Sequence, residues 1–218
     1  MNRREFSTSA ACILAGAALG FAGPAFAQAK KPENGTDYQT LGKIVASDAA
    51  PGKVEVIEFF WYSCPHCNAF EPKLEAWMKK LPPDVVLKRV PVAFRDDFVP
   101  QQRLYYTLEA MGKVDELHSK VFRAIHAERQ AINREDLIVE WVGKQGLDTG
   151  KFKELYNSFS VSSKARRATQ LQDAFKVQGV PAIGVAGRYY VDGDLAGNMD
   201  RALQITDYLI AEARKTAR

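Results

Sequence analysis

Val-Glu-Val-Ile-Glu-Phe-Phe-Trp-Tyr-Ser-Cys-Pro-His-Cys occupies residues 54–67 and places two cysteines directly behind an apolar run. Residues 54–62 are almost continuously apolar, with β-branched and aromatic side chains, which predicts a central strand covered on both faces. After the cysteines, residues 68–81 carry apolar side chains at helical spacing, with a predicted kink at Pro72. The stretch therefore predicts a strand, a cysteine pair and a helix in immediate succession.

The position of the pair Cys64-Pro65-His66-Cys67 between a strand and a helix favours redox chemistry. The start of a helix presents free backbone N–H groups and the positive end of the helix dipole, both of which stabilise a thiolate at Cys64. A charged His66 would stabilise it further. Since Cys67 lies one turn inward, we expect Cys64 to form mixed disulfides with a substrate and Cys67 to resolve them.

The remaining periodicity predicts an α/β sheet that is interrupted by helices. We expect a second buried strand over residues 85–94, a hairpin of strands at 180–185 and 188–191, and a short edge strand at 38–41. Helical spacing covers residues 101–111, 114–127, 134–144, 149–159, 162–177 and 198–215. Strands mixed with crossover helices predict an α/β fold, and the helical stretch from about Phe98 to Ser163 interrupts its sheet.

The N-terminus resembles an export signal. Arg3 and Arg4 precede an apolar stretch, and Ala25-Phe26-Ala27 is typical of a signal-peptide cleavage site, so we expect a signal peptide over residues 1–27 that is removed near Ala27. The apolar stretch is shorter than the ~20 residues that a membrane span needs. The adjacent arginines suit both the general and the twin-arginine export routes, and that choice stays open. We expect a periplasmic protein.

Cysteine usage agrees with this interpretation. The chain has three cysteines, and Cys12 lies within the predicted leader, so the mature protein would keep only Cys64 and Cys67. One closely spaced pair closes too small a loop to stabilise a fold, which favours a chemical role. Structural zinc needs four ligands, so no metal site is expected; His118 and His126 are interpreted as surface or helix–helix residues.

Composition excludes other classes. The 218 residues are 46% hydrophobic and 26% charged, which is ordinary for a globular protein. The net charge of +4 is spread along the chain without a basic run, so nucleic-acid binding is not expected.

Taken together, Glu58-Phe59-Phe60, Cys64-Pro65-His66-Cys67, the helix proline Pro72 and Gly179-Val180-Pro181 resemble the DsbA-type thiol:disulfide interchange proteins. The resemblance implies a thioredoxin fold with an inserted all-helical domain. Its first part would span residues 28–97, the helical insertion 98–163 and its second part 164–218. It also implies donation of the disulfide to exported polypeptides and reoxidation by a DsbB-like membrane quinone reductase, with no further cofactor.

The same resemblance implies roles for single residues. Pro181 would be a cis-proline that faces the cysteine pair, and Val180 before it would offer its backbone to an extended substrate peptide. Glu58, a carboxylate inside an apolar run, would handle protons near Cys67; the alternative is a solvated position at a sheet edge. Trp61 and Tyr62 precede the cysteines and are interpreted as a hydrophobic substrate groove, with a core position as the alternative.

Other functions remain open on the sequence alone. A disulfide isomerase of the DsbC type usually carries an N-terminal dimerisation domain, for which little chain precedes Cys64, so a monomer is expected. A dedicated periplasmic reductant more often lacks so large a helical insertion. A peptide-binding, chaperone-like module would work without its thiols, and replacing Cys64 by serine separates that case from the others.

Overall fold

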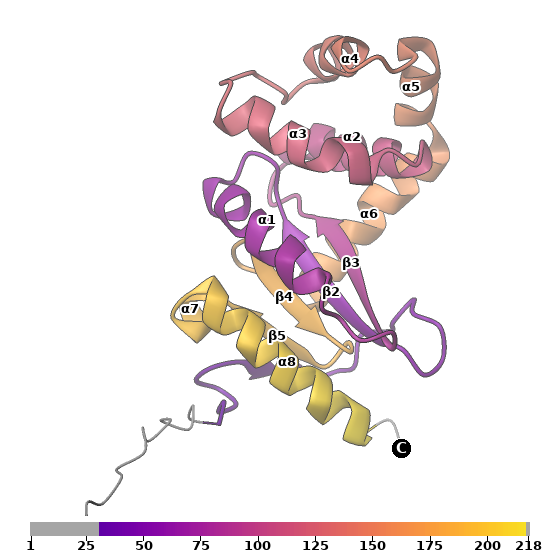
Figure 1. Ribbon diagram of the computed structural model, residues 1–218. Coiled ribbons are helices and arrows are strands. Elements are labelled where there is room, and N and C mark those ends of the chain that lie inside the picture. The colour runs from indigo at the N-terminus through magenta and orange to yellow at the C-terminus, as the bar shows by residue number, and fades with distance from the viewer. Residues whose placement is uncertain (1–30, 217–218) are drawn as a thin grey trace, which may run out of the picture. The chain divides into compact units, whose positions relative to one another are not determined.

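The computed structural model describes residues 31–216, which fold around one mixed sheet (Figure 1). The predicted signal peptide, its cleavage site at Ala27 and Cys12 lie outside the described residues. The strands are β1 (Gln39–Thr40), β2 (Val54–Phe60), β3 (Val85–Pro91), β4 (Ala182–Val185) and β5 (Tyr189–Asp192). Their order across the sheet is β1-β5-β4-β2-β3, in which only the β2–β3 pair is parallel. The fully buried β2 is central, as its apolar run predicts.

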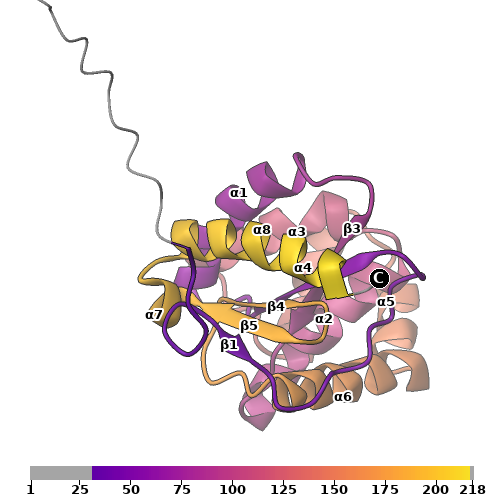
Figure 2. The ribbon, with the colours of Figure 1, turned by 90° about the horizontal axis from the view of Figure 1, so that it is seen from below.

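The helices fall into a group that covers the sheet and a group that lies at its end. They are α1 (Pro65–Met78), α2 (Val99–Ala110), α3 (Val114–His126), α4 (Glu135–Lys144), α5 (Thr149–Tyr156), α6 (Phe159–Ala174), α7 (Gly193–Ala196) and α8 (Met199–Thr216), with a 3-10 turn at Asp96–Phe98. Figure 2 shows α1 and α8 on one face of the sheet and α6 on the other. None of the helices within residues 31–216 combines the length and the apolar character that a bilayer span requires.

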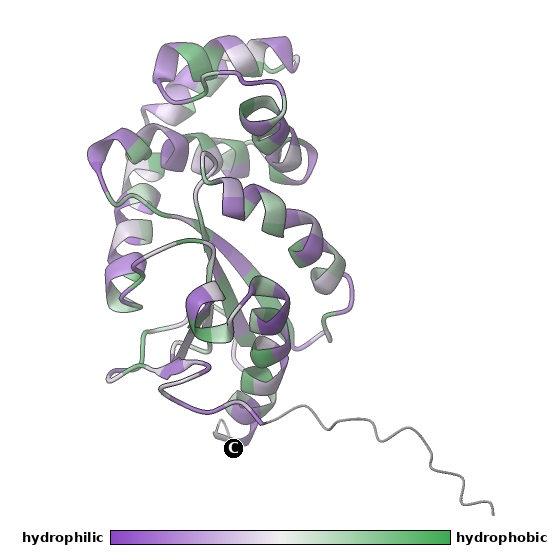
Figure 3. Ribbon diagram, turned by 90° about the vertical axis from the view of Figure 1, so that its left-hand side faces the viewer, coloured by the Kyte–Doolittle hydropathy of each residue, from purple (hydrophilic) through white to green (hydrophobic). Residues whose placement is uncertain are grey.

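Two apolar clusters hold these layers together. On one face, Val56 and Ile183 of the sheet pack with Leu74 of α1 and Leu209 of α8. On the other face, β2 buries Phe59 against Phe175, whose ring centroid lies 5.2 Å away. Figure 3 shows hydrophobic and hydrophilic residues alternating along the helices. The predicted fold class, a thioredoxin fold with a helical insertion, is confirmed.

We name α2 to α5, residues 99–156, the helical block. Three buried glutamines join it and α6 to β3 and to the segments that directly follow β2 and β3. Gln101 Nε2 donates to Ser63 Oγ at 2.8 Å, Gln102 Nε2 donates to the Pro91 carbonyl at 2.9 Å, and Gln172 Oε1 of α6 accepts from Ala93 N at 2.9 Å. The boundary expected at residues 163 and 164 lies inside α6, which runs unbroken from the helical block to the sheet.

The hairpin between β4 and β5 turns at Ala186 and Gly187, which both have positive φ (51° and 63°). A chain segment crosses this turn, since Val45 N donates to the Gly187 carbonyl at 2.8 Å and Leu41 N to the Arg188 carbonyl at 2.7 Å. A Cβ at Gly187 would lie 1.9 Å from the Val45 carbonyl oxygen, so only glycine fits there.

Replacement of Gly187 with alanine is therefore expected to destabilise the protein by about 3 kcal/mol or more, because a backbone oxygen must move and a left-handed conformation is strained. Urea unfolding measures the change. Gly197→Ala is the matched control: its φ is also positive (82°), but nothing lies within 4 Å of the added Cβ, so it loses only about 1–2 kcal/mol. Equal losses in the two variants would contradict the steric explanation.

Candidate active site

The cysteine pair lies at the start of α1. Cys64 is the residue that caps the helix, in an extended conformation, and Pro65 occupies the first turn, where its missing N–H costs nothing. Cys67 is completely buried, whereas Cys64 keeps 8% of its surface exposed. Both thiols are free. An incoming sulfur can therefore reach Cys64 far more easily than Cys67.

The loop before β4 faces this pair. The Val180–Pro181 peptide bond is cis, the geometry that the resemblance implies, and Cys64 Sγ donates to the Val180 carbonyl oxygen at 3.4 Å. A groove of about 460 Å³ opens beside it. Its walls are formed by His66, Gly179, Val180, Pro181, Asp192, Gly193, Asp194, Asn198 and Met199. His66 and the lining residues between 179 and 199 are far apart in the sequence, and they meet at one groove next to the Cys64 sulfur.

The two thiols differ strongly in acidity. A hydrogen bond from Cys67 and the backbone N–H groups of Cys67 and His66, aided by the charge of His66, lower the pKa of Cys64 to about 6, although partial burial opposes them. Burial, followed by the interaction with Cys64, raises the pKa of Cys67 far above its usual value. At neutral pH Cys64 is a thiolate while Cys67 keeps its proton.

A charged cluster, defined as Glu58, Glu71, Arg89 and His118, lies beneath the helix. Glu58 and Arg89 are partners in the β2–β3 register, and Arg89 Nε lies 3.2 Å from Glu58 Oε2. Arg89 Nη2 also donates to Glu71 Oε1 on α1. Burial, with the nearby charge of Glu71, raises the pKa of Glu58 to about 8 in spite of Arg89. Glu58 is fully buried on a central strand, so it does not lie at a solvated edge.

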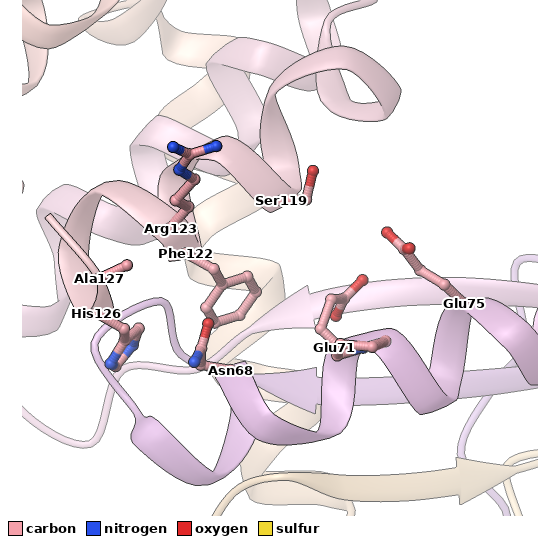
Figure 4. A pocket seen from close by; sticks show the side chains of 9 residues that line it. Asn68, Glu71, Glu75, Ser119, Phe122, Arg123, His126 and Ala127 are labelled. Atoms are coloured by element: carbon pink, nitrogen blue, oxygen red, sulfur yellow. The ribbon is translucent and has the colours of Figure 1, made fainter.

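A second pocket of about 320 Å³ opens between α1 and α3. Glu71, Glu75 and Asn68 of α1 face Ser119, Phe122 and His126 of α3 across it (Figure 4). Glu71 thus belongs to the charged cluster and also lines a pocket that opens to solvent.

The prediction of a groove at Trp61 and Tyr62 is wrong for Tyr62. Tyr62 is completely buried, because the chain turns inward after β2 and its ring packs against Phe60 at 5.1 Å between centroids. Trp61 is partly exposed and stacks on Phe98 at 3.8 Å, which places it on the side of the helical block. The groove beside Cys64 contains neither residue.

The sequence interpretation missed three members of the charged cluster: Glu71, Arg89 and His118. His118 is buried beside Glu71, so it is no surface residue, and His126 Nε2 bonds to the Tyr62 carbonyl at 2.8 Å. The sequence signal for Arg89 is that a charged residue stands inside a strand that is predicted to be buried. Within residues 31–216 no three His, Cys, Asp or Glu side chains gather in a way that could hold a metal ion.

A mixed sheet with a Cys-x-x-C pair at the start of its first helix and a cis-proline facing that pair defines the class of thioredoxin-fold dithiol–disulfide proteins. Comparison with known proteins narrows the class. The family model of the DsbA-like thioredoxin domain matches residues 55–204. The chain belongs to this family, and it is a thiol:disulfide oxidoreductase.

Individual relatives agree over the whole fold. The thiol:disulfide interchange protein DsbA of Bordetella pertussis is 46% identical over 210 residues, which cover 96% of this chain and 99% of that protein. DsbA of Pseudomonas aeruginosa is 38% identical, over 88% of this chain and 90% of its own length. A crystal structure of Pseudomonas aeruginosa DsbA superimposes with a TM-score of 0.82 and covers 87% of this chain and 98% of its own.

Proposed function

We propose that the protein donates its Cys64–Cys67 disulfide to exported polypeptides through a mixed disulfide. The observation that carries this proposal is the contrast between the two thiols: Cys64 has a pKa of about 6 and reaches the surface, and Cys67 is buried with a raised pKa. A stable Cys64 thiolate favours the reduced form of the pair, so the disulfide form is a strong oxidant.

The transfer takes two exchanges. A substrate thiolate attacks the Cys64 sulfur, the Cys64–Cys67 bond breaks, and Cys67 leaves and takes up a proton. A second substrate thiolate then attacks the substrate sulfur of the mixed disulfide, and Cys64 leaves as a thiolate. The substrate loses two electrons and gains a disulfide, while the pair gains both electrons. Cys64 is the better leaving group because its anion is stabilised at the helix start.

The surroundings supply the other roles. The groove beside His66 suits an extended peptide, which would contact the backbone of Val180 and the ring of Pro181. Glu58, whose pKa is about 8, holds a proton at neutral pH and is near enough to Cys67 to contribute to its raised pKa, so in this proposal it gives the proton when Cys67 leaves.

Several finer points belong to the same proposal. The leader over residues 1–27 would direct the chain to the periplasm, where it would act as a monomer with residues 98–163 as an inserted domain. A DsbB-like membrane protein would reoxidise the pair and pass the two electrons to quinone. These points rest on the leader sequence and on membership of the family.

The equilibrium between the Cys64–Cys67 disulfide and glutathione tests the proposal. We expect millimolar reduced glutathione, even with a comparable amount of oxidised glutathione present, to reduce most of the protein, because the Cys64 thiolate stabilises the reduced form. Tryptophan fluorescence or alkylation with a mass tag measures the reduced fraction. A disulfide that stays oxidised under these conditions would identify a reductant and overturn the proposal.

A further inference from the structure

His118 is a buried titratable side chain that the disulfide exchange does not use. It lies on α3 with 3% of its surface exposed, inside the aromatic cluster around Phe60. Its two ring nitrogens face different groups. Nδ1 lies 2.8 Å from Tyr62 Oη, and Nε2 lies 3.4 Å from Glu71 Oε1. The imidazole therefore lies between Tyr62, which follows β2, and Glu71 of α1.

These contacts indicate which ring nitrogen carries the proton. A charged carboxylate oxygen can only accept a hydrogen bond, so a hydrogen on Nε2, which lies 3.4 Å from Glu71 Oε1, is the arrangement that suits Glu71. Nδ1 is then free to accept from the Tyr62 hydroxyl, which is a donor. A neutral imidazole protonated at Nε2 satisfies both neighbours. Burial lowers the pKa of His118, and this outweighs the opposing effect of Glu71, so the ring is neutral at physiological pH.

The charged cluster cannot hold two free carboxylates. Arg89 is the guanidinium that contacts both Glu58 and Glu71, and the side chains of these acids are 0% and 5% exposed. One positive charge balances one carboxylate, and a second buried negative charge would be costly, so one acid keeps a proton. The other titratable groups around the cluster, Tyr62, Tyr105, Glu75 and Cys67, add no cation. Arg123 and His126 of α3 line the pocket beside Glu71, but Arg123 pairs with Glu128 and His126 contacts the Tyr62 carbonyl.

The two acids differ in their donors. Glu71 Oε1 accepts from Arg89 Nη2 and has the His118 ring beside it, whereas Glu58 has only the ion pair with Arg89 Nε. More donors favour the charged form of an acid. Burial alone would raise the pKa of Glu71, but His118 and Arg89 together lower it.

We propose that His118 is a positioning residue that assigns the negative charge of the cluster to Glu71 and thereby leaves the proton on Glu58, beside Cys67. The benefit of this proton placement for catalysis rests on the proposed disulfide exchange. A proton on Glu58 is available to Cys67, whereas a proton on Glu71 faces the pocket between α1 and α3. Without the imidazole, Glu71 loses a donor, and the two acids compete for Arg89 on more equal terms.

The test follows the Glu58 carboxyl carbon by NMR against pH in protein labelled with [δ-13C]glutamate, with Glu58→Gln to assign the signal. In the native protein we expect a titration midpoint near pH 8. His118→Phe keeps the ring volume but removes both contacts, and we expect it to lower the midpoint by at least about one pH unit. His118→Gln can donate to Glu71 and accept from Tyr62, so it should restore most of the native midpoint.

His126→Asn is the matched control, because it changes the other imidazole of α3, which contacts the Tyr62 carbonyl and not the acids. It should leave the Glu58 midpoint in place. A native midpoint in His118→Phe would overturn the proposal.

A second measurement needs no variant. The 15N shifts of the His118 ring in the native protein should show the neutral form protonated at Nε2 at pH 7 to 9, and a charged ring or the other tautomer there would overturn the proposal. Neither readout involves disulfide transfer. Failure of the glutathione experiment would therefore remove the proposed function and leave this charge arrangement standing, and the reverse also holds.

Discussion

Replacing Cys64 with serine is expected to lower the rate of disulfide transfer by ~10³-fold or more, to the background of uncatalysed oxidation. Cys64 is the sulfur that a substrate thiolate can reach, and Cys67 is completely buried beneath the helix. A serine hydroxyl forms no disulfide, and a substrate thiolate cannot reach the buried Cys67. Oxidation of a reduced, unfolded dithiol protein by the variant, followed by alkylation and mass spectrometry, measures the rate.

The matched variant is Cys67→Ser, which keeps the reactive thiol and removes the resolving one. We expect it to accumulate a stable mixed disulfide between Cys64 and an oxidised peptide, visible as one added peptide mass. Loss of transfer in both variants, with a mixed disulfide only in Cys67→Ser, fits the assigned roles. If Cys64→Ser still assisted folding at the native rate, the thiols would be incidental and the protein would act as a peptide-binding module.

Replacing Glu58 with glutamine is expected to stabilise the protein at alkaline pH. The pKa of Glu58 is about 8 in the folded state and near 4.5 when unfolded, so the unfolded state releases its proton first as the pH rises. Folding therefore loses stability from about pH 4.5 up to about pH 8. A difference of some 3.5 pKa units corresponds to ~5 kcal/mol, an upper limit because the cluster can relax.

Urea unfolding between pH 4.5 and pH 8.5 measures this effect, with both proteins in the disulfide form so that the thiols do not titrate. The two free energies of unfolding should be close at pH 4.5, and Glu58→Gln should become progressively more stable than the native protein up to pH 8. Glu75→Gln, an exposed glutamate of α1, is the control, since no burial cost is relieved there. Parallel curves for the native protein and Glu58→Gln would contradict the raised pKa.

Features that follow from contiguous sequence were predicted well. The run from Val54 onward specifies a buried strand by its own composition, and the cysteines follow it directly, so the reactive loop could be placed without coordinates. The helices of the helical block follow from spacing alone. The four-residue helix α7 was missed because it is too short for a periodic pattern; it begins where Asp192 Oδ1 accepts from Asp194 N and Leu195 N.

Features that depend on distant segments could not be read from the chain. Arg89, Glu71 and His118 lie on β3, α1 and α3, and only the packing of these elements around Glu58 brings them together. An aromatic side chain next to a reactive loop does not reveal which way it points, so the sequence alone cannot separate a groove position for Tyr62 from a core position. Its burial depends on α3, which supplies His118 as its hydrogen-bond partner.

The buried glutamine contacts of α2 and α6 oppose local unfolding of these helices. Gln101, Gln102 and Gln172 are almost completely buried, so separating α2 or α6 from the rest of the core would expose their amides and leave the groups that they bind without a partner. We therefore expect the helical block and the sheet to unfold together, with amides in α2 exchanging with solvent about as slowly as those in β2.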